Sequence, residues 1–293
     1  MSGGGGGHFG GMKKTLLSIG HGYSAQALAA VLMPQGWRVI GTTRSSEKAD
    51  AIRETGAEAV VWPGGSEDIP ALQEASHLLV SAGPTEAGDP VLQILGRQIA
   101  AAAARLGWVG YLSTTAVYGD HGGGWVDETT PLTPASRRGR LRVQAEGEWA
   151  AIPGLALHIF RLAGIYGPGR GPFAKVRAGT ARRIIKPGQV FSRIHVEDVA
   201  QVLAASMARP NPGAVYNLCD DDPAPPEAVI AYAAGLLGVP VPPAVAYEVA
   251  EMTPMARSFY GENKRVRNDR IKDELGVELR YPGYREGLGA LVL

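Results

Sequence analysis

The sequence predicts an α/β fold in which a doubly wound parallel sheet carries a smaller C-terminal lobe. Short β-rich runs alternate with helical patterns from Lys13 to about Arg161. Strands that alternate with helices imply right-handed crossovers, and therefore a parallel sheet with helices on both faces. After Gly167 the content of glycine, proline and charged residues rises, and the alternation becomes irregular. We therefore expect the later segments to form a smaller lobe over the strand ends.

Seven segments are predicted as strands of the main sheet. Each is a short run of apolar, β-branched or aromatic residues, as expected for strands that are buried on both faces. In chain order they are residues 15–20, 38–43, 58–62, 77–81, 108–113, 155–161 and 214–218.

Five segments have helical patterns, and they separate or follow these strands. The third of them starts with an Asp89–Pro90 pair, which suits an N-cap and a first helical position. The main domain is expected to span residues 12–168, with 195–218 returning to it. Residues 169–194 and 219–293 are expected to form the smaller lobe, and residues 1–11 a glycine-rich leader. The predicted helices are residues 24–35, 46–55, 89–106, 195–209 and 226–238.

Composition excludes several classes of protein. The 29 basic and 28 acidic residues give a net charge of +1, so no global field favours nucleic acid or an anionic membrane. Cys219 is the only cysteine, which excludes an internal disulfide and a cysteine-built zinc site. The six histidines show no metal-ligand spacing, and no apolar run approaches the roughly 20 residues of a membrane span. We expect a cytoplasmic protein without a metal.

The junction between the first strand and the first helix carries a glycine pattern. Gly20, Gly22 and Ala25 form G-x-G-x-x-A, which permits a tight turn, close approach of a pyrophosphate and close helix–sheet packing. The first helical residues, Tyr23 and Ser24, add backbone N–H groups and a partial positive charge. The pattern predicts a Rossmann dinucleotide site, and the alternative is a tight turn without a ligand.

Two further strand ends bear on the cofactor. The second strand is followed by Arg44 and Ser45, where many NAD-binding proteins carry an acid for the ribose 2′-hydroxyl. An arginine there matches the 2′-phosphate of NADP, so NADP is favoured over NAD, and a solvent-facing arginine is the alternative. Ser81, Ala82 and Gly83 end the fourth strand. We expect them to pass beneath the adenosine half of the cofactor, with a plain glycine turn as the alternative.

Four later segments resemble one enzyme family, the extended short-chain dehydrogenases/reductases of the NAD-dependent epimerase/dehydratase branch. The fifth strand of that family ends with Ser/Thr followed by V-Y-G, and its later strands carry R-P-x-x-(V/I)-Y-G-P-G-x, (F/Y)-I-H-V-x-D-(V/L)-A and Y-N-(V/I)-G. The resemblance covers about residues 14–290, in order and with plausible spacing. The matching segments here are YLSTTAVYGD, RLAGIYGPGR, RIHVEDVA and AVYNLCDDDPAP.

The resemblance implies a catalytic helix that is altered in this chain. In the family this helix carries Y-G-x-S-K-x-x-A-E, whose tyrosine is the general acid/base and whose lysine lowers the tyrosine pKa and holds the nicotinamide ribose. Gly139, Ala145 and Glu146 match the G, A and E of this motif. The register then places Arg138 at the tyrosine position and Arg142 at the lysine position.

This exchange changes the chemistry that we expect. Arginine, with a pKa above about 12, stays protonated, so Arg138 is not expected to exchange a proton with a substrate. It can instead clamp a carboxylate or phosphate, or stabilise developing negative charge, while Arg142 can donate to ribose hydroxyls. Thr114 matches the family's carbonyl-polarising Ser/Thr. Tyr118 and His121 are alternative acid/base candidates, and structural packing is their other interpretation.

The remaining segments of the resemblance imply contacts on both sides of the cleft. Leu162 is expected beside the cofactor. The residues expected beside the substrate are Tyr166, Arg193 and His195.

These features together predict an NADP(H)-binding, atypical extended short-chain dehydrogenase/reductase without the usual proton relay. It would be an oxidoreductase or epimerase-like enzyme acting on a small hydroxyl or carbonyl compound, either anionic or a sugar nucleotide. The alternative is a catalytically inactive NADP(H)-binding sensor or regulatory protein. A nucleic-acid binder is disfavoured because no second basic surface accompanies Arg137, Arg138, Arg140 and Arg142. We expect a small-molecule partner, no membrane, and a monomer or homodimer.

Overall fold

A seven-stranded parallel sheet forms the centre of the protein. The computed structural model describes residues 14–65 and 69–292, so the expected leader at 1–11 lies outside the described residues. The strand order is β11-β7-β5-β4-β1-β2-β3, and every pairing in this sheet is parallel. The doubly wound prediction is therefore confirmed. The bounds are β1 Thr15–Ile19, β2 Arg38–Thr43, β3 Glu58–Val61, β4 His77–Val80, β5 Trp108–Thr114, β7 Leu157–Leu162 and β11 Val215–Leu218.

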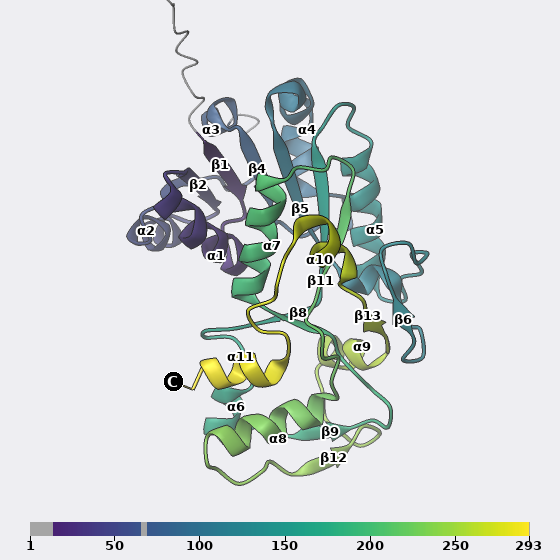
Figure 1. Ribbon diagram of the computed structural model, residues 1–293. Coiled ribbons are helices and arrows are strands. Elements are labelled where there is room, and N and C mark those ends of the chain that lie inside the picture. Colours follow the sequence, from purple (N-terminus) through teal and green to yellow (C-terminus); the bar gives the residue numbers. More distant parts are fainter. Residues whose placement is uncertain (1–13, 66–68, 293) are drawn as a thin grey trace, which may run out of the picture.

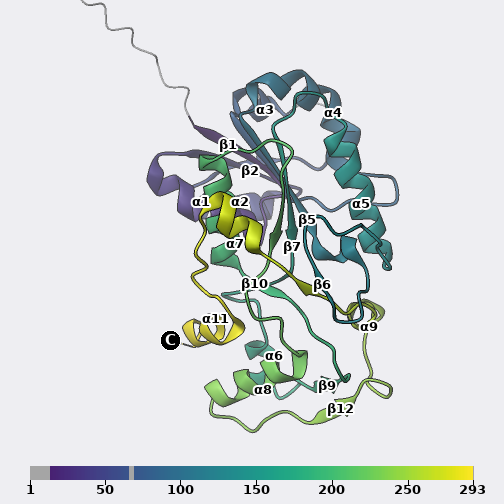
Figure 2. The ribbon, with the colours of Figure 1, turned by 45° about the vertical axis from the view of Figure 1, so that its right-hand side comes forward.

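Helices cover both faces of this sheet, as Figures 1 and 2 show. Successive side chains of a strand point to opposite faces, so Leu16 joins the core beneath one helical layer and Leu17 the core beneath the other. Burying each such leucine contributes roughly 1.5–3 kcal/mol. One layer holds α1 (Tyr23–Leu32), α2 (Ser46–Glu54), α7 (Val196–Ala208) and α10 (Asp269–Leu275), and the other α3 (Pro70–Glu74), α4 (Pro90–Ala102) and α5 (Arg137–Ala150).

The element boundaries differ from the sequence expectations mainly at helix ends. The predicted helix 24–35 is α1 followed by the 3-10 turn η1 (Met33–Gln35), because Pro34 interrupts the α-helical hydrogen bonding. The predicted helix 89–106 is α4, capped by Asp89, followed by η2 (Ala103–Arg105). The short helix α3 was not predicted, since five residues give no readable period.

The smaller lobe lies below the C-terminal ends of the strands in Figure 1. Its own apolar core includes Phe173, Val229 and Leu288. The lobe contains α6 (Phe173–Arg177), β9 (Arg183–Ile185), α8 (Pro226–Leu236), β12 (Ala244–Ala246), α9 (Pro254–Tyr260) and α11 (Tyr284–Ala290). The expected lobe segment 219–293 needs one correction: α10 contributes Ile271 and Leu275 to the core of the main sheet.

Two short parallel pairings join the lobe to the main sheet. β8 (Gly164–Tyr166) pairs with β10 (Arg193–His195), and β6 (Trp125–Val126) pairs with β13 (Arg265–Val266). The second pairing brings residues 259–266 beside the loop that follows β5. Among residues 14–65 and 69–292, no helix has the length and apolar character needed to cross a membrane.

Candidate functional site

The turn between β1 and α1 has the geometry of a phosphate cradle. Gly20 has φ of +82°, and a Cβ there would lie 3.2 Å from the Ala82 backbone nitrogen, so the position suits glycine. Gly22 is the N-cap of the ten-residue helix α1 and supplies no side-chain cap. Its own Cβ position meets only the Gly20 oxygen, 3.9 Å away. The backbone N–H groups of Gly20, His21 and Gly22 are used within the protein, on Thr42 and on the Gly20 carbonyl. The N–H groups at the start of α1, which follow them, are the ones that an approaching anion can meet.

The residues that follow this turn have different environments. Tyr23 opens α1, and its hydroxyl donates to the Pro168 carbonyl at 2.9 Å. Ser24 and Ala25 are both buried, and Ala25 belongs to the core between α1 and the sheet. The small side chain at 25 therefore permits the close helix–sheet packing that the sequence predicts.

The end of β2 presents a free cation. Arg44 is exposed, and no hydrogen bond or ion pair engages its guanidinium within the described part of the chain. Ser45 caps α2 by accepting from the Lys48 backbone nitrogen at 3.4 Å. His21, which sequence reasoning missed, packs over Gly41 with both ring nitrogens lacking partners in the described structure. Burial lowers the pKa of His21, so its imidazole is neutral at pH 7.

The end of β4 passes next to the glycine turn. The Ser81 backbone nitrogen donates to the Ile19 carbonyl at 2.9 Å, which holds these two strand ends together. The Ala82 carbonyl accepts from Arg142 at 3.5 Å, and a Cβ at Gly83 would lie 3.5 Å from an Arg142 nitrogen. The three residues Ser81, Ala82 and Gly83 thus link the cofactor turn with helix α5.

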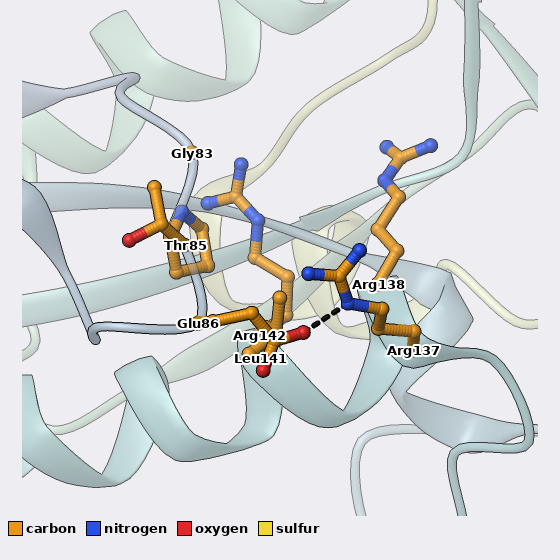
Figure 3. Close-up of a pocket in the computed structure, with 8 residues that line it drawn as sticks. Gly83, Thr85, Glu86, Arg137, Arg138, Leu141 and Arg142 are labelled. Atoms are coloured by element: carbon orange, nitrogen blue, oxygen red, sulfur yellow. Dashed lines mark hydrogen bonds and ion pairs between the residues drawn. The ribbon is translucent and has the colours of Figure 1, made fainter.

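Helix α5 places four arginines in its first six residues. Ser136 caps the helix by accepting from the Gly139 backbone nitrogen at 3.2 Å. Figure 3 shows Arg138 and Arg142 leaving α5 on the same side, while Arg137 turns toward Glu86 and pairs with it. Arg140 is exposed and donates to the Ala135 carbonyl at 2.8 Å. The helical spacing of four residues explains the shared direction of Arg138 and Arg142.

Arg142 anchors α5 to the neighbouring strand ends. Its Nη1 donates to the Leu112 carbonyl at 2.6 Å and to the Tyr111 hydroxyl at 3.0 Å. Its guanidinium carbon also lies 5.5 Å from the centre of the Tyr111 ring. One face of Arg142 is therefore held by the protein, and the other faces the hollow drawn in Figure 3.

Arg138 lines the same hollow, which has a volume of about 460 Å³. Its guanidinium carbon lies 6.0 Å from the centre of the exposed Phe259 ring. Partial desolvation and the positive charges of Arg142 and Arg170 lower the pKa of Arg138. It still carries its full charge near neutral pH. The hollow is lined by Gly83, Pro84, Thr85, Glu86, Arg137, Arg138, Leu141 and Arg142.

Thr114 ends β5 with a hydroxyl that can still donate. Its Oγ1 accepts from the Ala116 backbone nitrogen at 3.3 Å, and this bond caps η3 (Thr115–Tyr118). The register of the sheet pairs Thr114 with Leu162, and both are buried. Thr114 and Leu162 thus lie side by side at the strand ends.

The expectation that Tyr118 acts as an acid/base is corrected by its surroundings. The side chain is 0% exposed, its hydroxyl donates to Asn217 at 2.7 Å, and it accepts from Arg161 at 3.0 Å. Burial raises the pKa of Tyr118 to about 12, with Arg161 opposing that shift. Arg161 also pairs with Glu146 at 2.8 Å, so Tyr118 belongs to a buried structural network.

Tyr166, Arg193 and His195 gather at the junction between the lobe and the sheet. His195 and Tyr166 are opposite one another in the β8–β10 pairing, with ring centres 5.2 Å apart. The Tyr166 hydroxyl donates to the Gly283 carbonyl at 3.3 Å, and Arg193 donates to the Phe191 carbonyl at 2.8 Å. The protein thus uses these polar groups to hold the wall of the cleft together.

Three residues that sequence reasoning missed lie close to Arg138. Phe259 contacts it, and the charges of Arg170 and Glu262 both act on it. The β6–β13 pairing brings the segment that contains Phe259 and Glu262 close to Arg138. No local sequence pattern predicts this pairing. The Tyr-x-x-x-Lys spacing in this segment makes no dyad, because the Tyr260 ring packs edge to face with Phe191 and Lys264 binds Glu262.

Comparison with known proteins places the chain among its relatives. No family model matches it. Protein YeeZ of Escherichia coli strain K12 is 31% identical over 283 residues, which cover 92% of this chain and 97% of YeeZ. The chain belongs to the YeeZ family. A functionally unknown conserved protein from Silicibacter pomeroyi DSS, whose structure is solved, is 68% identical with a TM-score of 0.92, over 95% of this chain and 98% of that one.

More distant structures show how the YeeZ fold relates to known enzymes. The NAD complex of dTDP-glucose 4,6-dehydratase from Bacillus anthracis is 17% identical, with a TM-score of 0.76 over 95% of each chain. A human epimerase family protein, SDR39U1, solved with NADPH, is 18% identical, with a TM-score of 0.73 over 95% of this chain and 99% of that one. The fold is therefore that of the epimerases and dehydratases, as the resemblance implied.

Proposed function

We propose that the protein binds NADP(H) and acts as an oxidoreductase or epimerase-like enzyme on a small hydroxyl or carbonyl compound. One observation carries this proposal: the uncapped N-terminus of α1 follows the Gly20–Gly22 turn at the end of β1, and the adjacent strand β2 ends at the exposed Arg44. The α1 N-terminus suits a pyrophosphate, and Arg44 suits a 2′-phosphate. Two structural neighbours that were solved with NAD or NADPH support a nicotinamide dinucleotide.

The proposed cofactor supplies hydride transfer, and the chain supplies positioning. The α1 N-terminus and Arg44 would hold the two phosphate-bearing ends of the adenosine half. The free side of Arg142 would donate to ribose hydroxyls, because its other contacts fix the guanidinium at the strand ends. Thr114 would donate its O–H to a carbonyl oxygen, since its only described hydrogen bond leaves that proton unused.

The register of the catalytic-helix motif supports an atypical chemistry. Gly139 is packed against the Ala116 carbonyl, so the N-terminus of α5 lies directly against the turn that follows Thr114. Arg138 is then the side chain at the position of the family's tyrosine. It stays charged, so it would stabilise negative charge on a substrate without exchanging a proton.

A second candidate function is that of a cofactor sensor without catalysis. The burial of Tyr118 favours it, because this removes one acid/base candidate near the cleft. The other, His121, has its Nε2 3.0 Å from the Tyr118 carbonyl oxygen. A protein that keeps the cofactor cradle but lacks a proton-transfer group would bind NADP(H) without turnover.

Binding and turnover, measured separately, distinguish the two candidates. NADPH binding is followed by fluorescence, and NADPH oxidation is then assayed with a panel of aldehydes, ketones and sugar nucleotides. We expect turnover that falls roughly 100-fold in Thr114→Ala and recovers in Thr114→Ser, since loss of one oxyanion donor costs that much. NADPH binding without turnover in any arm would support the sensor. Absence of NADPH and NADH binding would contradict both candidates.

A further inference from the structure

The start of helix α5 carries an unusual charge arrangement. Helix N-termini favour acidic side chains, because the exposed N–H groups give that end a partial positive charge. The first turn of α5 has no acidic residue, and Arg137 and Arg138 are its first two residues. Like charges at one helix end are unfavourable, so an anion that binds there would be stabilised by any arginine whose donors are unused.

Three of the four arginines in α5 have partners within the protein. Arg137 pairs with Glu86, Arg140 donates to the Ala135 carbonyl, and Arg142 donates to the Leu112 carbonyl. Arg138 differs: within residues 14–65 and 69–292 its guanidinium makes no hydrogen bond or ion pair. Its described contact is the face of Phe259, which accepts a cation but neutralises no charge.

A second arginine, Arg170, lies by the start of α1. Arg170 follows β8, and its guanidinium carbon lies 5.6 Å from the centre of the Tyr23 ring. The Tyr23 hydroxyl donates to the Pro168 carbonyl at 2.9 Å, which holds the turn before Arg170 over the start of α1. No acid pairs with Arg170 in the described chain. Its charge reaches Arg138, whose pKa it lowers.

The acid whose charge acts on Arg138 is already in an ion pair. Glu262 acts on Arg138 electrostatically, but its Oε2 is bound to the Lys264 ammonium group at 2.6 Å. Both members of that ion pair are only 10% exposed. Arg138 therefore leaves positive charge at the 460 Å³ hollow that it lines, which is large enough for a small ligand.

We infer that Arg138, at the hollow that it lines, binds the anionic group of the substrate, a carboxylate or a phosphate, and that Arg170 adds positive charge nearby. This inference rests on the proposed function and narrows its substrate to a small organic anion, such as an oxo or hydroxy acid or a phosphate ester. The planar guanidinium of arginine presents paired N–H donors that match either anion. The arginine at the tyrosine position thus has a recognition role.

Titration calorimetry on the protein saturated with NADP⁺ tests the site. The probes are pyruvate, inorganic phosphate, and methyl pyruvate as the uncharged counterpart of pyruvate. We expect wild type to bind at least one anion and to discriminate against methyl pyruvate. Arg138→Gln should weaken anion binding by about 10- to 100-fold. Arg138→Lys should weaken it by less, because lysine keeps the positive charge but lacks the paired N–H donors of the guanidinium. Arg140→Gln is the matched control on the same helix, with an expected change of less than roughly twofold.

Three results would overturn the inference. In the first, pyruvate and methyl pyruvate bind equally well and phosphate does not bind. In the second, the anion affinity of Arg138→Gln equals that of wild type. In the third, Arg138→Gln loses as much affinity for NADP⁺ as for the anion. The last would assign the site to the cofactor's own phosphates. Circular dichroism confirms that each variant is folded. If the wild-type protein does not bind NADP⁺ but still binds an anion through Arg138, the proposed function is wrong, whereas the anion site is supported.

Discussion

At the scale of single residues, the candidate site depends on which cations are already neutralised. Arg137 pairs with Glu86, and Arg142 is held on one side by the Leu112 carbonyl, which leaves its other side for a ligand. Arg44 and Arg138 make no such bonds in the described chain. An unpaired arginine beside a backbone cradle is a recognition group, whereas a paired one is a structural group.

The first prediction concerns cofactor choice at Arg44. Arg44→Ala should weaken NADPH binding by roughly 10- to 100-fold, the loss expected for a charge-assisted bidentate contact, and should leave NADH binding within about twofold. Fluorescence titration with both cofactors measures this. Arg53→Ala is the control, since Arg53 lies on the following helix and pairs with Asp50. An equal loss for NADH, or no loss for NADPH, would remove Arg44 from the cofactor site.

The glycine turn and the arginine at the ends of β1 and β2 were readable from sequence, but the partners of these residues were not. Gly20, Gly22 and Arg44 follow strands, and parallel strands end at one edge of a sheet, so their proximity is a consequence of topology. Tyr118 misled the prediction because a loop tyrosine has the same sequence signal whether it faces solvent or a buried Asn217. Arg170 was missed because its place against Tyr23 depends on how the chain folds back after β8.

At the scale of elements, α5 connects the cofactor turn to the hollow. Its position is fixed at Gly139, where a Cβ would lie 2.6 Å from the Ala116 carbonyl oxygen and 2.8 Å from Pro134 Cβ. The helix therefore approaches the η3 turn as closely as the backbone allows. Gly147, two turns later, has open space around its Cβ position.

This contrast gives a matched pair of substitutions within one helix. Gly147→Ala should stabilise the protein by roughly 0.5–1 kcal/mol, because alanine has the higher helix propensity. Gly139→Ala should destabilise it by about 1–3 kcal/mol, because the methyl group overpacks a tight contact. Urea unfolding midpoints measure both changes. Stabilisation by both alanines would show that α5 does not pack against η3 as described.

Long elements were predictable from sequence, and short ones were not. β2 has the bounds that the sequence predicts, and β7 and α7 are displaced by one or two residues, because runs of this length carry a clear pattern. β6 and β13 have two residues each, so no periodicity can mark them. Their pairing nevertheless decides which lobe residues face Arg138. The least predictable elements are thus the ones that complete the candidate site.

At the scale of the whole molecule, a buried carboxyl lies where the sheet meets the lobe. Asp220 follows β11, is 1% exposed, and its Oδ2 has no hydrogen-bond partner in the described structure. Burial raises the pKa of Asp220 from its ordinary 3.8 to about 8. The folded protein therefore keeps this proton up to about pH 8, whereas the unfolded chain releases it near pH 4. Unfolding releases a proton between these values, so stability falls as pH rises through that window.

Asp220→Asn should remove this pH-dependent loss. The variant should be more stable than wild type at pH 8, by an amount on the order of a few kcal/mol, with the difference shrinking toward pH 4–5. Denaturant unfolding at several pH values measures it. Asp273→Asn, at an exposed site on α10, is the control and should show no gain that grows with pH. A stability difference that is constant across pH would mean that Asp220 is ionised in the folded protein.

We propose that this member of the YeeZ family binds NADP(H), and a direct binding measurement tests this proposal. Purified wild-type protein is titrated with NADPH and, separately, with NADH, and the fluorescence of the reduced nicotinamide is followed. We expect saturable 1:1 binding of NADPH, with an affinity at least roughly 10-fold higher than the affinity for NADH. Failure of both cofactors to bind, or equal affinity for the two, would contradict it.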